Sequence, residues 1–114
     1  MKSARGRGGL VEGILYENVA VVGPVQTAID VDLEYEGSDV PPTNRSATPV
    51  FRNVTLHNVT GRSTNQSIFV RGLPESPIEA FSMHGVSLTS DSSAAITTTH
   101  AEVLMNHVAV RPLP

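Results

Sequence analysis

The feature that most constrains the fold is a short strand pattern that recurs along the chain. Each copy opens on an apolar residue and carries a small or polar residue followed directly by valine. The first residues of the copies are spaced by 40, 27 and 22 positions. No stretch spaces its apolar residues as an amphipathic helix does, so the pattern indicates an all-β chain. The copies are Ile14–Val22, Val54–Arg62, Phe81–Thr89 and Val103–Arg111.

A second strand pattern lies between the copies of the first. Its members are Ala28–Tyr35, Ser67–Leu73 and Ala94–His100, and their isoleucines are spaced by 39 and 28 residues. Because the two patterns share nearly the same spacings, they predict a parallel β-helix of about four coils, in which equivalent residues stack along the axis. A β-sandwich would also supply many short strands, but it would not require shared spacing. The extra length of the first repeat is assigned to a surface loop at 36–48, which is polar and contains Pro41-Pro42.

One column of the first pattern holds Asn18 and Asn58. In a β-helix, stacked asparagines can form an inward ladder in which side-chain amides bond to one another and to the backbone. The alternative is two separate asparagines in surface turns.

Composition narrows the classes of function. A net charge of -3 argues against nucleic-acid binding. No apolar run approaches the ~18 residues that suggest a membrane span. The chain has no cysteine, and its four histidines are dispersed, so neither a metal site nor a cofactor is expected. We expect the histidines to be turn or surface residues.

Several segments resemble family 28 of the glycoside hydrolases, the polygalacturonases. The opening MKSARGRGGLVEGILYENVAV is similar to the part of that family that follows its catalytic histidine motif. Later segments, AIDVDLEYEG, TPVFRNVTLHNVTG, IFVRGLPESPIEAF and VLMNHVAV, resemble its successive coils. The resemblance implies a right-handed parallel β-helix and inverting hydrolysis of α-1,4-galacturonide bonds in pectin. It also implies a secreted or periplasmic protein.

The catalytic elements of the family are missing from this chain. Its Asn-Thr-Asp, Asp-Asp and Gly-His-Gly motifs do not occur in the sequence. We therefore expect residues 1–114 to be a single C-terminal segment of such an enzyme, without catalytic residues and inactive alone. As a lone chain it is expected to self-associate, because a solenoid without caps exposes apolar ends. The alternative is a complete, non-catalytic β-helical module that binds acidic polysaccharide or a protein partner.

The resemblance singles out a few candidate substrate-binding residues. Lys2 matches a family lysine that binds the carboxylate of galacturonate, as a compact point charge can. Arg7, together with Arg5, could extend this positive rim, although arginines in such a segment are more often solvated turn residues. Tyr35 matches a tyrosine near the sugar subsites, where a ring can pack on a sugar face; its strand alternation also fits a core-capping aromatic.

Four acids form the opposite face of the strand that ends at Tyr35. Carboxylates at neighbouring positions on one face can divide the roles of general acid and base, because like charges raise one pKa. The simpler interpretation, a solvated acidic face, is favoured. The residues are Asp30, Asp32, Glu34 and Glu36.

Overall fold

The computed structural model describes residues 1–34, 48–91 and 96–112. This part of the chain holds five strands and no helix, and every pairing between the strands is parallel. The sheet order is β1-β2-β3-β5, and β4 pairs with β2. The strands are β1 (Leu10–Asp32), β2 (Val50–Arg71), β3 (Ile78–Ser90), β4 (Ile96–Thr99) and β5 (Ala101–Pro112).

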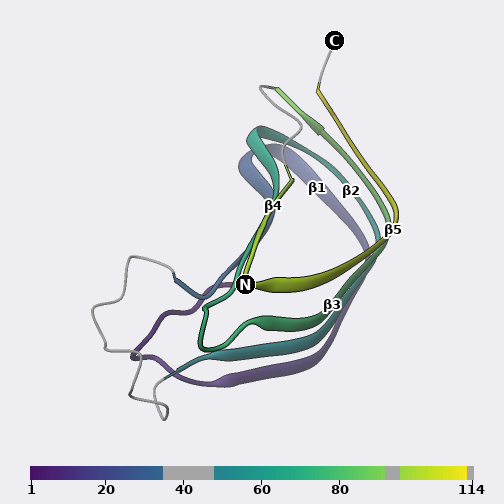
Figure 1. The fold of residues 1–114 in the computed structure, drawn as a ribbon. Helices are drawn as coiled ribbons and strands as arrows, with labels where there is room; N and C mark the ends of the chain where they lie inside the picture. The colour runs from purple at the N-terminus through teal and green to yellow at the C-terminus, as the bar shows by residue number, and fades with distance from the viewer. Residues whose placement is uncertain (35–47, 92–95, 113–114) are drawn as a thin grey trace.

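The strand register confirms both predicted columns. In the first, Ile14 pairs with Val54, Val54 with Phe81, and Phe81 with Val103. In the second, Ile29 pairs with Ile68, which in turn pairs with Ile96. Successive coils lie side by side and turn at the same edge, as Figure 1 shows. The fold is therefore the predicted parallel β-helix, and the alternative of an antiparallel sandwich is wrong. The predicted loop at 36–48 falls almost entirely outside the described residues.

Residues with positive φ mark the corner at which each coil bends. Asn18, Asn58, Gly85 and His107 occupy equivalent positions in successive coils, with φ of 56°, 58°, 66° and 55°. Glycine and asparagine tolerate this left-handed conformation better than most residues. The small or polar position before each valine is thus a backbone requirement of the bend.

The predicted asparagine ladder forms, but on the outside of the coil. Asn58 Nδ2 donates to Asn18 Oδ1 over 2.7 Å, and both residues are exposed. The inward placement was therefore wrong. The reason is the bend itself, because the valine that follows each asparagine fills the interior; Val59 is only 2% exposed.

Apolar side chains from both columns meet in the interior and form the core. Burying each of these side chains contributes about 1.5–3 kcal/mol. At the β1 end the interior opens into a cavity of about 330 Å³, lined in part by Tyr16, Val19 and Ile29. The fully buried centre consists of Val54, Ile68, Val70, Leu73, Ile78, Phe81 and Met83, with Leu33 beside them.

Candidate functional site

The cation-bearing N-terminal segment is fixed along the last residues of β1. Ser3 N donates to Asp32 O over 2.8 Å, and Asp32 N donates to Met1 O over 2.9 Å. Lys2 and Asp32 form an isolated parallel bridge. The segment therefore lies beside the sheet as a short extra strand, which holds Lys2 at a defined place.

Lys2 presents a partly exposed ammonium at this place. Its Nζ lies 3.5 Å from Asp30 Oδ2, and its side chain is 43% exposed. The Met1 amine donates to Asp30 O over 2.8 Å, and burial lowers the pKa of that amine. Asp30 Oδ1 is buried and makes no hydrogen bond within the described structure. Asp30 thus orients the lysine and leaves its charge accessible from one side.

Asp32 is buried and paired with Arg71. Arg71 Nε donates to Asp32 Oδ1 over 2.9 Å, and Arg71 Nη2 donates to Oδ2 over 2.8 Å. The Glu34 N–H also donates to Asp32 Oδ1, over 2.8 Å. This bidentate hydrogen bonding raises the pKa of Arg71. The predicted solvated acidic face is therefore wrong for Asp32, because its carboxylate fixes the end of the strand; Glu36 lies outside the described residues.

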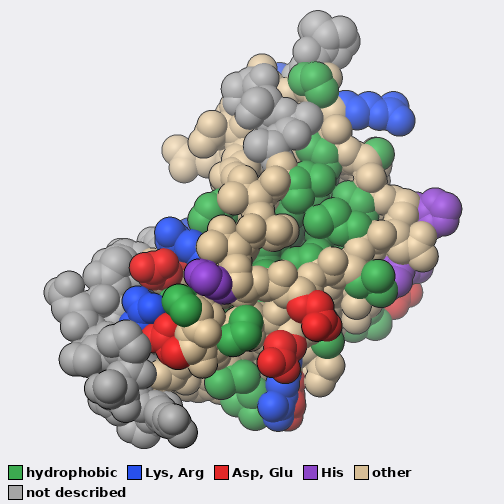
Figure 2. All heavy atoms as spheres, viewed as in Figure 1, with side chains coloured by type: hydrophobic (Ala, Val, Ile, Leu, Met, Phe, Trp, Pro, Cys, Tyr) green, Lys and Arg blue, Asp and Glu red, His purple; other side chains and the backbone are tan. Residues whose placement is uncertain are grey.

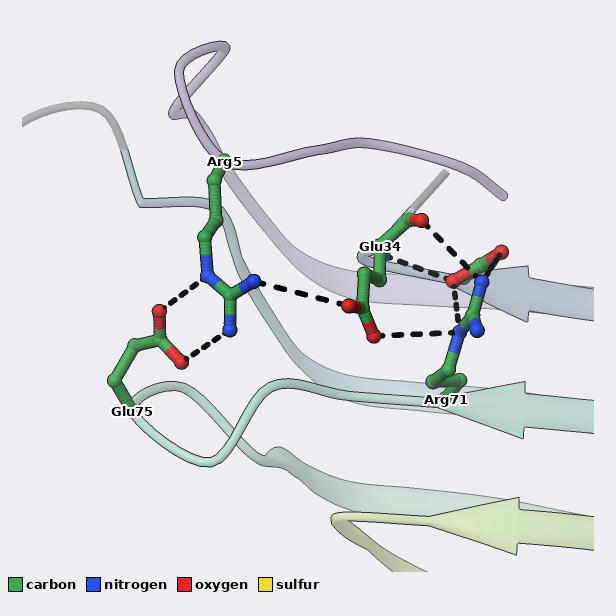
Figure 3. Close-up of polar contacts among 5 residues, drawn as sticks. Arg5, Glu34, Arg71 and Glu75 are labelled. Atoms are coloured by element: carbon green, nitrogen blue, oxygen red, sulfur yellow. Dashed lines mark hydrogen bonds and ion pairs between the residues drawn. The ribbon is translucent and has the colours of Figure 1, made fainter. Parts of the chain in front are cut away.

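Arg5 joins the N-terminal segment to the turn between β2 and β3. Its Nε donates to Glu75 Oε2 over 2.6 Å, and its Nη2 donates to Oε1 over 2.9 Å. Arg5 Nη1 also lies 3.8 Å from Glu34 Oε1, and Arg71 Nε lies 3.9 Å from Glu34 Oε2. Figure 3 shows Glu34 between the two arginines, so the charges alternate along one row. Arg5 is accordingly a turn residue with carboxylate partners, and the solvated interpretation is wrong for it.

The other predicted site residues are less closely tied to this row. Arg7 is exposed, and its backbone N–H donates to Ala4 O over 3.0 Å in the turn. Tyr35 lies outside the described residues. His57, His100 and His107 are exposed, as predicted, and His84 is partly exposed.

Part of this arrangement could have been found from the sequence. Asp32 and Arg71 are separated by the same 39 residues as Ile29 and Ile68, so the column spacing places them on adjacent strands. The Arg5–Glu75 pair carries no such signal, because both residues lie in irregular turns outside the columns.

The Arg5–Glu75 pair makes stability depend on pH. Hydrogen bonding from Arg5 lowers the pKa of Glu75 from 4.5 to about 2. A carboxyl group whose pKa is lower in the folded state stabilises the fold at pH values above its unfolded-state pKa. This contribution is lost as the pH falls from about 4.5 towards 2. We expect Glu75→Gln to lower the free energy of unfolding by about 1 kcal/mol at neutral pH. The difference from the wild-type protein should shrink in urea titrations at decreasing pH.

Glu79→Gln is the matched control for this prediction. Glu79 is exposed and makes no ion pair within the described part of the chain. Its substitution should change stability by less than about 0.5 kcal/mol. A Glu75→Gln effect that is equal at pH 7 and pH 2.5 would contradict the assignment of the pKa shift to this pair.

The family model for "Glycosyl hydrolases family 28" matches residues 1–107. The chain therefore belongs to this family and has the fold of a polygalacturonase-like glycosidase. Searches of curated proteins and of solved structures gave no match. In the described residues, no helix is long and apolar enough to cross a membrane.

Proposed function

We propose that this chain is the C-terminal segment of a polygalacturonase-like hydrolase that cleaves α-1,4-galacturonide bonds with inversion. The acid and base of that reaction would come from residues outside this chain, since the Asn-Thr-Asp and Asp-Asp motifs do not occur in it. The observation that carries the proposal is the partly exposed side chain of Lys2, on a segment that is hydrogen-bonded to the sheet.

Lys2 would bind the carboxylate of a galacturonate unit. An ammonium acts as a point charge and does not demand a planar partner, so it can accept a carboxylate from several directions. Asp30, at 3.5 Å, would hold the ammonium in place when no sugar is bound. Arg7 would add positive charge at the rim, and Tyr35 would pack on a sugar ring.

The proposal predicts that the chain binds oligogalacturonate and that Lys2→Met weakens this binding about tenfold, or 1.4 kcal/mol. Removing the charge leaves the sugar carboxylate without its partner, whereas the apolar stem of the side chain is kept. Isothermal titration with oligogalacturonate measures the effect. Full methyl esterification of the ligand should cause a similar loss in the wild-type protein and almost none in the variant.

Arg111→Met provides the matched control, since Arg111 is an exposed cation on β5, the strand at the opposite edge of the sheet. Its loss should leave the affinity within a factor of two. The wild-type chain should release no reducing ends from polygalacturonate. Equal binding by the wild-type and Lys2→Met proteins would exclude the role of Lys2, and release of reducing ends would show that the chain holds its own catalytic groups.

We further propose that the isolated chain self-associates through the exposed apolar surface of its β1 end. Leu15 and Val22 there are 57% and 85% exposed, and Tyr16, which lines the cavity, is 43% exposed. A parallel edge strand with exposed apolar side chains favours pairing with another chain. Sedimentation velocity over a hundredfold range of concentration tests this, and a monomer throughout would contradict it.

Export from the cell, to the periplasm or the medium, follows from a polymeric substrate. Fractionation of producing cells tests it, and a strictly cytoplasmic protein would contradict it.

A further inference from the structure

Two histidines that are 27 residues apart in the sequence lie side by side on the outer surface. His57 on β2 pairs in register with His84 on β3. Glu17 on β1 is the partner of His57 on the other side, and Asn106 on β5 is the partner of His84. The four residues form one row across the coils, directly before the corner residues.

The corner holds both imidazoles towards solvent. Neighbouring strands of a sheet are about 4.8 Å apart, and residues in parallel register project from the same face. His57 is exposed and His84 is partly exposed. Neither imidazole makes a hydrogen bond or ion pair within the described chain, so all four ring nitrogens lack a protein partner there. Figure 2 shows histidine side chains at the edge of the molecule where the coils turn in Figure 1, with acidic side chains next to them.

We propose that His57 and His84 form a surface site for one borderline divalent transition-metal ion, such as Ni²⁺, Cu²⁺ or Zn²⁺. Imidazole nitrogens are preferred ligands of these ions, and two imidazoles on adjacent strands can chelate one ion. The site does not suit calcium or magnesium ions. These ions require several oxygen donors, and this row offers a single carboxylate.

The rest of the coordination shell is water. No group of three His, Cys, Asp or Glu side chains converges on a point within the described residues, so the site has two protein ligands. Glu17 lies next to His57 in the row and lowers the energy of a bound cation by its charge. The site is independent of the galacturonan proposal, because Lys2 lies on the N-terminal segment, which pairs with Asp32 at the C-terminal end of β1.

Isothermal titration of the untagged protein with NiCl2 tests the site. We expect one Ni²⁺ per chain, and a loss of affinity of at least about tenfold in His57→Asn and in His84→Asn. Asparagine suits the row, since Asn106 already occupies it on β5. Thermal melts without metal should show that both exposed positions accept the change.

His100→Asn is the matched control, because His100 is also exposed but lies in the turn between β4 and β5, away from this row. It should bind Ni²⁺ like the wild-type protein. The proposal is overturned by an absence of binding heat, by unchanged affinity in the His57 and His84 variants, or by an equal loss in His100→Asn.

Discussion

Replacing Gly72 with alanine should lower the free energy of unfolding by about 3 kcal/mol or more, enough to unfold a marginally stable chain. A Cβ at this position would lie 2.2 Å from His100 O and 2.8 Å from Ile78 N. Both atoms belong to the backbone and are joined by a hydrogen bond, in which Ile78 N donates to His100 O over 3.0 Å. The clash therefore cannot be relieved by a side-chain rotation and must move two coils apart.

The position explains why no side chain fits. Gly72 follows the last residue of β2, and its N–H donates to Thr99 O over 2.8 Å. Leu73 and Ile78, on either side of the turn that follows, are both fully buried. Separation of the strands at this point would break the hydrogen bonds of the turn and expose part of the core.

Gly85→Asn is the control that separates this clash from a general need for glycine. Gly85 has φ of +66°, and a Cβ there would approach only Asn58 backbone atoms, at 3.8 Å and beyond. Asparagine already occupies the same corner at positions 18 and 58. This variant should stay within about 1 kcal/mol of wild type. Urea unfolding followed by circular dichroism measures both; a Gly72→Ala protein as stable as Gly85→Asn would refute the assignment.

The columns of the β-helix could be predicted because stacking makes the core repeat. Ile14, Val54, Phe81 and Val103 differ in type but share an apolar character, and their spacing alone gave the register that the structure has. Each coil packs only on its neighbours, so a wrong register predicted for one coil would not change the register predicted for the others. The same alignment placed Asn18 and Asn58 in one column, and their positive φ shows that this column is the corner.

The candidate site was less accessible to prediction because it depends on how turns approach one another. Arg5 and Glu75 lie in turns whose paths no repeat determines. The outward direction of the asparagine ladder required the sign of φ at the corner, which sequence spacing does not provide. The histidine row could have been predicted but was not. The histidines look dispersed in the sequence, although the 27-residue spacing between coils places His57 beside His84.

Replacing Phe81 with alanine should have the second large effect, a loss of about 3–5 kcal/mol in the free energy of unfolding. Phe81 is 0% exposed and pairs in register with Val54 on one side and Val103 on the other. Truncation removes the apolar contacts of the ring and leaves a cavity, which small movements of the neighbouring coils cannot fill. Because repeat proteins are stabilised by contacts between adjacent coils, the loss weakens two interfaces at once.

Phe69→Ala is the matched truncation, since it removes the same ring from the outside of the coil. Phe69 is partly exposed, and the Arg71 Cζ lies 5.2 Å from its ring centroid. This variant should lose only about 1 kcal/mol, from the arginine contact and partial burial. Equilibrium unfolding in urea compares the two. If both truncations reduced stability equally, the stacked interior could not be the main source of stability, because only Phe81 lies within it.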